Sequence, residues 1–343
     1  MLNFGKNSME RNVELSLLLY YYIFLIFLAF VAALFNTNTR LSYFIFFLVF
    51  VGYSVLSRDR VPKNDILAYN SFMDIPLYAY KDIYFLREPV YWFSSKLLYE
   101  YFDNPFPVYL IIDIFSIAVF LFALYKNKYQ AYFLYLFTVF FVSVLGFQNV
   151  YRQYLATFFI LAAIFLIAEN KFKTKVFTLI LGFLTHNVVA LYVPMLLATS
   201  KIKSIFRMIL ALIPLVIFLG AVASSKSNSE TGDTNPILFI AVFIVTMLFY
   251  IALNKLRFTG KYLKYFYYYI YSLILIIVAL PIFGQAQVKR IAMICLLISL
   301  FAIYDTIESK FKRENLIIVR VLFILFAISP ILISSTLQDI INY

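Results

Sequence analysis

The stretch NKFKTKVFTLILGFLTHNVVALYVPMLLATSKIKSIFR, residues 170–207, sets one apolar run between two segments rich in lysine and arginine. In membrane proteins such basic segments gather on the cytoplasmic side. If both flanks are cytoplasmic, the run between them must enter the membrane and return. The sequence therefore predicts a hairpin of two half-crossings, 175–184 and 187–200, which turns at His186, the only histidine of the chain.

The alternative is a single full span, which would reverse the orientation of every later loop and set the basic loops against the positive-inside rule. In the hairpin, His186 lies at the outer face of the membrane and not in the hydrocarbon. A lone histidine in an apolar run is most often structural. At an outward turn beside arginines and carboxylates, it could also bind phosphate or act as a general acid or base.

Composition places the whole chain in a membrane. Of its 343 residues 64% are hydrophobic, 20% are aromatic and only 13% are charged. Long apolar runs favour membrane-spanning helices over the alternating strands of a barrel. We expect an all-α polytopic protein with one integral domain, 1–343. The net charge of +12 is explained by cytoplasmic loop ends, so no nucleic-acid partner is expected.

A spanning helix needs roughly 20 apolar residues. The first apolar run has no cleavage-site pattern and is read as a retained span. With it, about ten full spans are predicted beside the hairpin: 15–34, 41–57, 106–125, 129–147, 151–168, 205–222, 236–253, 265–284, 291–305 and 316–335.

Basic loops orient these spans. Lysine and arginine concentrate in alternate loops, which we place in the cytoplasm: 125–129, 170–175, 200–207, 254–264 and 308–313. The long segment 58–105 is then external. Its stretch REPVYWFSSKLLYEYF, from 87 to 102, predicts a surface-lying or re-entrant helix, in which Tyr91 and Trp92 suit a membrane interface.

Unusual polar residues converge on this external side. Arg58 and Arg60 leave the second span just before Asp65 and Tyr69, and paired arginines can fork around phosphate oxygens. They could equally reach the interface with long side chains and form local salt bridges. Glu88 could contribute its carboxylate to a site. Alternatively, its negative charge could simply be stabilised by the positive N-terminal end of the helix that follows it.

Two arginines stand at the outer ends of later spans. Arg152, followed by Gln153, opens the span at 151–168, where a guanidinium is costly unless it is paired or faces a cavity. Arg290 has a similar place before 291–305. Asp113, inside the third span, is a candidate partner for Arg152 or a purely structural polar residue. Snorkelling from the helix end is the alternative for Arg152.

Other kinds of site find little support. The single cysteine, Cys295, lies in an apolar segment and permits neither a disulfide within the chain nor a cysteine metal site. The sequence has no nucleotide-binding P-loop and no zinc-protease pattern. We therefore expect no cofactor and no metal.

These residues, in this order, resemble the EpsG-like and Wzy-type bacterial polysaccharide polymerases. The resemblance rests on an arginine at the end of an early span (Arg58 or Arg60), then DILAY, EPVYW, YRQYLA and LTHNVVALYVP. It covers residues of about 50–200, and Arg290 is a looser correspondence. Each motif is weak alone, and the ordered set is moderately specific.

The resemblance implies a glycosyltransferase of the bacterial inner membrane with its active site on the periplasmic face. It would polymerise repeat units carried on undecaprenyl diphosphate into O-antigen or capsular polysaccharide, as in lipopolysaccharide synthesis. Donor and acceptor are both lipid-linked glycans, and a chain-length regulator protein is a further possible partner. The expected roles are diphosphate binding by Arg58, Arg60, Arg152 and Arg290, proton transfer by Asp65, Glu88 or His186, and glycan contact by Tyr69, Tyr91, Trp92 and Gln153.

Two rival functions stay open. A flippase for lipid-linked oligosaccharide would also need a cationic cavity, but it predicts internal repeats and charges at mid-membrane, which the sequence does not show. An O-antigen ligase would pass the finished glycan to a lipid core. The repeat-unit sugars, the stereochemistry and the identity of the base do not follow from the sequence.

Overall fold

The computed structural model describes residues 6–35, 37–58, 64–147, 149–223 and 235–333. These residues form helices and no strand, so the all-α prediction is confirmed. Within them, six helices are long and apolar enough to cross a membrane: Leu17–Leu34, Arg40–Arg58, Pro105–Lys126, Lys203–Gly220, Ile237–Asn254 and Lys261–Lys310. The chain is a polytopic membrane protein, while the number of ten full spans stays a prediction.

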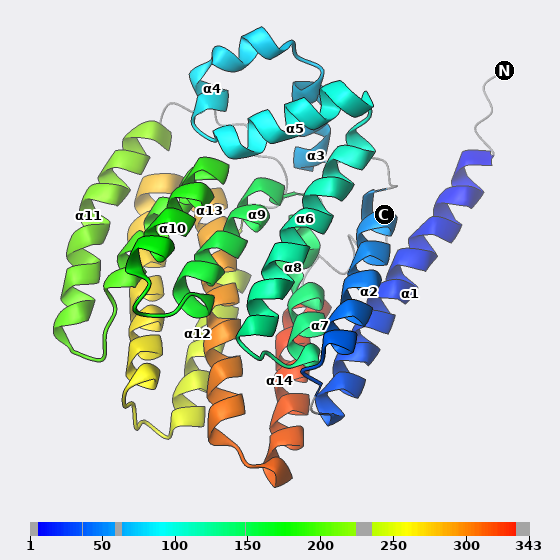
Figure 1. Cartoon of the computed structure of the whole chain (residues 1–343). Helices are drawn as coiled ribbons and strands as arrows, with labels where there is room; N and C mark the ends of the chain where they lie inside the picture. Colours follow the sequence, from blue (N-terminus) through cyan, green and yellow to red (C-terminus); the bar gives the residue numbers. More distant parts are fainter. Residues whose placement is uncertain (1–5, 36, 59–63, 148, 224–234, 334–343) are drawn as a thin grey trace. The chain divides into compact units, whose positions relative to one another are not determined.

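Helix contacts divide the chain into two compact units, each built from separate stretches of sequence. Figure 1 labels the helices of both units. Unit 1 comprises Met1–Pro62, Asn104–Gln148 and Phe311–Tyr343, and unit 2 comprises Lys63–Asp103 and Asn149–Lys310. The single integral domain over 1–343 remains a prediction.

Unit 1 contains α1 (Lys6–Leu34), α2 (Arg40–Arg58), α6 (Pro105–Lys126), α7 (Ala131–Val139), α8 (Phe141–Gly146) and α14 (Arg313–Ile333). Helix α1 packs on α7, and α2 packs on α6. The predicted span 129–147 is divided between α7 and α8, because the backbone of Phe140 is extended (φ −64°, ψ 133°). Tyr22 donates to the carbonyl of Val139 beside this break, which helps to satisfy the interrupted backbone.

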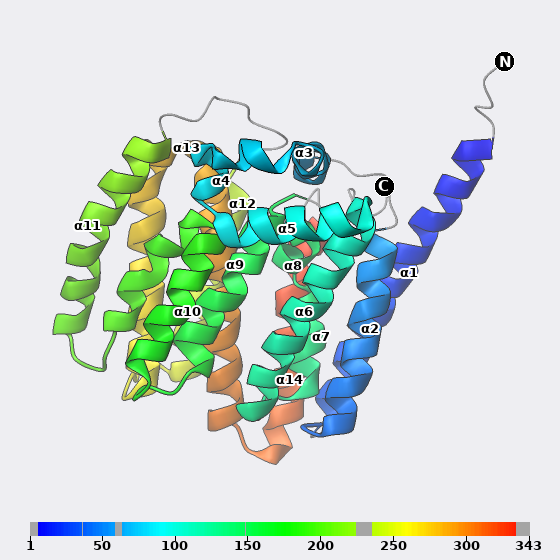
Figure 2. The same cartoon turned by 45° about the horizontal axis from the view of Figure 1, so that its top comes forward.

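Unit 2 begins with the short helices α3 (Asn64–Met73), η1 (Leu77–Lys81), α4 (Ile83–Leu86) and α5 (Pro89–Phe102). Its longer part comprises α9 (Tyr151–Leu161), η2 (Ala162–Leu166), α10 (Phe172–Thr185), η3 (Asn187–Leu197), α11 (Lys203–Ala223), α12 (Ile237–Asn254) and α13 (Lys261–Lys310). Figure 2 shows α5 crosswise to α9 and α10, and α5 contacts α10.

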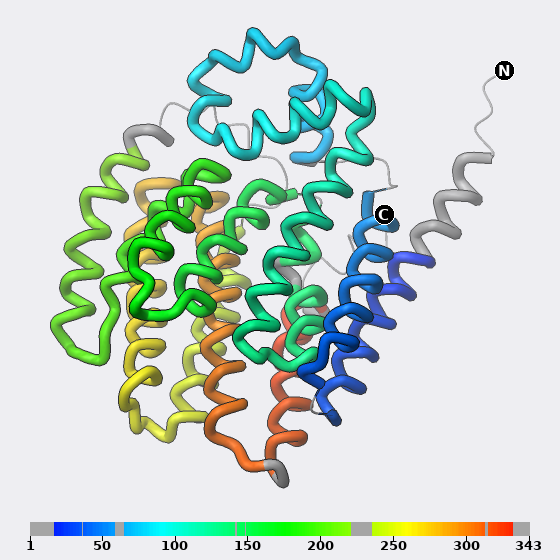
Figure 3. Tube along the Cα trace, in the orientation of Figure 1, coloured from blue at the N-terminus to red at the C-terminus, as the bar shows by residue number. Residues whose placement is uncertain are grey.

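The apolar run that holds the only histidine breaks at that residue. Helix α10 ends at Thr185, His186 is extended (φ −157°, ψ 129°), and the 3₁₀ helix η3 begins at Asn187. Helix η3 packs on both α10 and α11, and the green part of the tube in Figure 3 folds back on itself. The predicted turn at His186 is present in the structure. Its position outside the membrane stays a prediction.

A second reversal lies inside α13, at Gly284. This glycine has a positive φ (75°, with ψ 173°), a conformation open to glycine because it lacks a Cβ. The two arms run antiparallel, since Lys261 pairs with Asp305 at 3.0 Å and the Tyr269 hydroxyl lies 3.4 Å from the carbonyl oxygen of Ser299. The segments 265–284 and 291–305 fall in these two arms, and their separate crossing of the membrane stays a prediction.

Candidate active site

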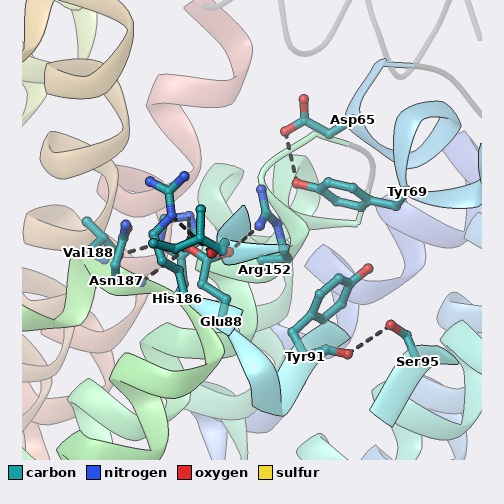
Figure 4. A network of polar contacts seen from close by, with 11 residues as sticks. Asp65, Tyr69, Glu88, Tyr91, Ser95, Arg152, His186, Asn187 and Val188 are labelled. Carbon is teal, nitrogen blue, oxygen red and sulfur yellow. Dashed lines mark hydrogen bonds and ion pairs between the residues drawn. The ribbon is translucent and has the colours of Figure 1, made fainter. Parts of the chain in front are cut away.

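The centre of the site in unit 2 is a buried ion pair between Glu88 and Arg152. Pro89 occupies the first turn of α5, and a residue before proline is pushed out of the helical region; Glu88 has φ −135° and ψ 56°. Its side chain does not cap its own helix. Instead, Oε2 of Glu88 accepts a hydrogen bond from Nη1 of Arg152 on α9 (Figure 4). Both residues are buried, so each charge depends on the other.

Aromatic rings surround the guanidinium of Arg152. Its central carbon lies 4.8 Å from the ring centre of Trp92, 5.0 Å from that of Tyr69 and 6.0 Å from that of Tyr84. Its buried Nε has no hydrogen-bond partner among the described residues. Arg152 therefore has a positive charge and a free Nε–H donor, and an anionic ligand could bind to both.

His186 lies on the other side of Glu88. Its Nδ1 accepts a hydrogen bond from the backbone N–H of Val188 at 3.2 Å, which caps η3. In the neutral imidazole the proton is therefore assigned to Nε2, which lies 3.7 Å from Oε1 of Glu88. The backbone N–H of Asn187 donates to the same oxygen at 3.4 Å. The turn between α10 and η3 thus fixes both the ring and its tautomer.

A second carboxylate–arginine pair extends the network. The Tyr69 hydroxyl donates to Oδ2 of Asp65 at 3.4 Å, and Nη2 of Arg290 lies 3.8 Å from the same oxygen. Burial raises the pKa of Asp65, and the positive charges of Arg290 and Arg152 act against that rise. Burial also raises the pKa of Tyr69 to about 12. Because the ring of Tyr69 also faces Arg152, the two pairs form one cluster.

The remaining predicted site residues of this unit are buried next to Tyr69 or Arg152. Tyr91 and Trp92 are buried, and the ring centres of both lie 5.7 Å from that of Tyr69. Gln153 is also buried on α9, next to Arg152. Such packing holds Tyr69 and Arg152 in place, and contact of these residues with a glycan stays a prediction.

The surface of α5 is amphipathic. Val90, Leu97 and Tyr101 are exposed, whereas Trp92 and Lys96 are buried. The Nζ of Lys96 donates to the carbonyl of Met73 at 2.9 Å, which ties α5 to the end of α3. A helix with one apolar exposed side fits the predicted surface-lying or re-entrant element.

Arg58 belongs to unit 1 and has a dense set of partners there. Its Nε and Nη2 donate to the carboxylate of Asp113 at 2.8 and 3.1 Å, and Nη1 donates to the carbonyl of Phe147. The guanidinium also lies over the rings of Tyr109 and Phe147. Asp113, expected from the sequence as a candidate partner of Arg152, pairs with Arg58. Arg60 lies outside the described residues.

The sequence reasoning missed Tyr84 and the backbone N–H of Asn187. Tyr84 has only a weak signal, its position four residues before Glu88 in an aromatic stretch. Nothing in residue type marks a backbone donor. Within the described ranges no three side chains of His, Cys, Asp or Glu form a group that could hold a metal ion. Metal independence remains a prediction.

Helices of this length define an integral membrane protein, and unit 2 buries a cluster of arginines, carboxylates and one histidine. A family model gives the identity more closely: that of the EpsG family matches residues 43–343, and the chain belongs to this family. Membership indicates a membrane protein of polysaccharide biosynthesis. No curated protein and no solved structure matches the chain.

Proposed function

We propose that the chain is a polysaccharide polymerase that works on polyprenyl-diphosphate-linked repeat units at the periplasmic face of the inner membrane. The observation that carries this proposal is Arg152, a buried guanidinium held on one side by Glu88 with its Nε unused. Transfer of a glycan from a lipid diphosphate needs such a preorganised cation, because negative charge develops on the leaving group.

In the proposed reaction, a hydroxyl oxygen of the acceptor repeat unit attacks the anomeric carbon of the growing glycan. The bond from this carbon to the diphosphate oxygen breaks, and the lipid diphosphate leaves with the electron pair. Arg152 and Arg290 stabilise the leaving charge. Arg290 is suited to this role because its side chain is 26% exposed and within reach of a ligand.

The proton of the acceptor hydroxyl passes to one of three groups: Asp65, Glu88 or His186. Glu88 carries a charge-stabilising arginine on one oxygen and the imidazole near the other, so Glu88 and His186 can share the proton. Asp65 has a raised pKa, which brings a carboxyl group closer to the pH at which a base is useful.

Arg58 takes no part in the proposed chemistry. Its three nitrogens already bind Asp113 and the carbonyl of Phe147 inside unit 1. We assign it to the packing of α2 against α6.

Gene deletion followed by electrophoresis of the surface glycan tests the function. Loss of a polymerase leaves core material bearing a single repeat unit, and reintroduction of the gene restores the long ladder. Loss of an O-antigen ligase removes glycan from the core. Loss of a flippase traps lipid-linked precursor on the cytoplasmic side. Either of the last two patterns would contradict the proposal.

A further inference from the structure

Unit 1 holds an apolar groove of about 310 Å³ between α2 and α6. Its walls repeat at helical spacing on both sides: Arg40, Tyr43, Phe44 and Phe47 on α2, and Ala118, Leu121, Phe122 and Tyr125 on α6. Phe44 and Phe122 are 57% and 63% exposed, so large apolar surface stays open beside the groove. In a membrane, such a surface faces acyl chains.

Positive charge gathers at one end of this groove. Arg40 is the first residue of α2 and lines the groove, while Lys126 is the last residue of α6. The Nζ of Lys126 lies 5.2 Å from the ring centre of Phe122, which brings the ammonium over a groove wall. Arg40 and Lys126 therefore flank the same opening.

Neither cation is neutralised locally. Arg40 and Lys126 are exposed, and no described carboxylate pairs with either of them. The sequence segments 37–58 and 114–147, which supply both walls, contain no Asp or Glu. The ring pair of Tyr43 and Tyr125, with centres 5.3 Å apart, stands at the charged end. Aromatic residues of this kind belong at the level of lipid headgroups.

We propose that this groove binds a glycerophospholipid with an anionic headgroup. One acyl chain would lie between α2 and α6 against Phe47 and Ala118, and the phosphate would meet Arg40 and Lys126. Cations next to the membrane surface attract anionic lipid, and the apolar walls set the depth of the chain. The loop 125–129 is predicted to be cytoplasmic, so the lipid would come from the cytoplasmic leaflet. The residues of this groove belong to unit 1, whereas the proposed active site is formed by residues of unit 2.

Native mass spectrometry of the purified full chain tests the proposal. The protein in detergent is titrated with dioleoyl-phosphatidylglycerol or with dioleoyl-phosphatidylcholine, which differ in net charge and share their acyl chains. We expect the anionic lipid to be retained more strongly. Arg40→Gln and Lys126→Gln should each lower that preference by roughly five-fold, and the variant with both changes should remove it.

Two matched pairs of variants separate this site from general lipid adsorption. Ala118→Leu narrows the groove and should reduce retention of both lipids, whereas Val119→Leu, on the exposed side of the same helix, should not. Lys173→Gln removes an exposed lysine of unit 2 and should leave the preference intact. Equal retention of the two lipids by the unsubstituted protein would overturn the proposal. So would a loss in Lys173→Gln as large as that in Arg40→Gln, or unchanged retention in Ala118→Leu.

Discussion

Nη1 of Arg152 donates to Oε2 of Glu88 across 64 residues of sequence, and both side chains are buried. The pair joins the start of α5 to the start of α9 in unit 2. It therefore serves the fold as an ion pair and, in the proposed reaction, presents a cation to the lipid diphosphate. These two roles can be separated by experiment.

Removal of one partner should damage the fold more than removal of both. Glu88→Gln removes the ion-pair partner of the buried Arg152, and breaking a buried pair from one side typically costs about 3–5 kcal/mol. The double variant Glu88→Gln/Arg152→Gln lacks both charges of this pair and should unfold closer to the wild-type temperature, although it should remain inactive. Thermal unfolding in detergent, read together with polymerisation, checks both statements. Equal destabilisation of the single and double variants would contradict the pairing.

The pH dependence of the polymerisation rate should follow the ionisation of the Asp65 carboxyl group. A carboxylate that accepts a proton must be ionised, so the rate falls as pH falls through its pKa. Burial raises the pKa of Asp65, which places this fall at a higher pH than for an ordinary aspartate. Arg290 lowers that pKa, so Arg290→Gln should move the fall to still higher pH.

The measurement is the polymerisation rate of purified protein across the acidic range. Arg207→Gln, which removes an exposed arginine of α11, should keep the wild-type midpoint. Asp65→Asn should abolish the titration. A wild-type profile in both Asp65→Asn and Arg290→Gln would exclude Asp65 as the base.

At His186, one substitution should keep the N-cap of η3 and remove the proton-transferring imidazole. Asparagine is a strong N-cap residue, so His186→Asn should still accept from the N–H of Val188 and preserve η3. It cannot transfer a proton near neutral pH, and the loss of a general acid or base typically lowers the rate about 10²–10⁴-fold. Normal membrane abundance with strongly reduced polymerisation is expected. A wild-type rate would limit His186 to the structural role.

Much of the fold was predictable, because the length of an apolar run and the charge of its flanking loops can be read directly from the local sequence. Apolar runs marked the long helices, and the two basic flanks predicted the turn at His186. Other features depend on the backbone. The break at Phe140 carries no proline or glycine signal, and a single apolar run could equally have continued through it. The reversal at Gly284 shows how one glycine within a polar stretch can end a span.

The site was predictable in its members and not in its pairing. Residue type made Arg152, Glu88 and His186 candidate site residues. Ionisable side chains in apolar segments are energetically costly, so they usually have a function. Which carboxylate meets which arginine depends on helix packing, so Asp113 could not be assigned from the sequence. It pairs with Arg58, whereas Glu88 pairs with Arg152. His186 caps η3 by accepting a hydrogen bond from the backbone N–H of Val188, and a backbone donor leaves no trace in residue type.

Topology can be checked without any activity assay. Reporter fusions after Lys173 and after Lys203 should both read cytoplasmic, and a fusion next to His186 should read external. The reason is that both basic flanks of the apolar run obey the positive-inside rule only if the run returns. Opposite readings at Lys173 and Lys203 would show a single crossing, and His186 could then not lie at a periplasmic site.

The most direct test of the central claim is polymerisation by Arg152→Lys. Lysine keeps the charge but lacks the planar fork that binds Glu88 and, in the proposed reaction, would also bind a diphosphate. Loss of a preorganised charge donor typically lowers the rate about 10²–10³-fold, so Arg152→Lys should leave mainly single-repeat glycan at normal protein abundance. Arg320→Lys, at a buried arginine of unit 1, is the matched control and should keep long chains. Long-chain glycan at wild-type levels in Arg152→Lys would contradict diphosphate binding by Arg152.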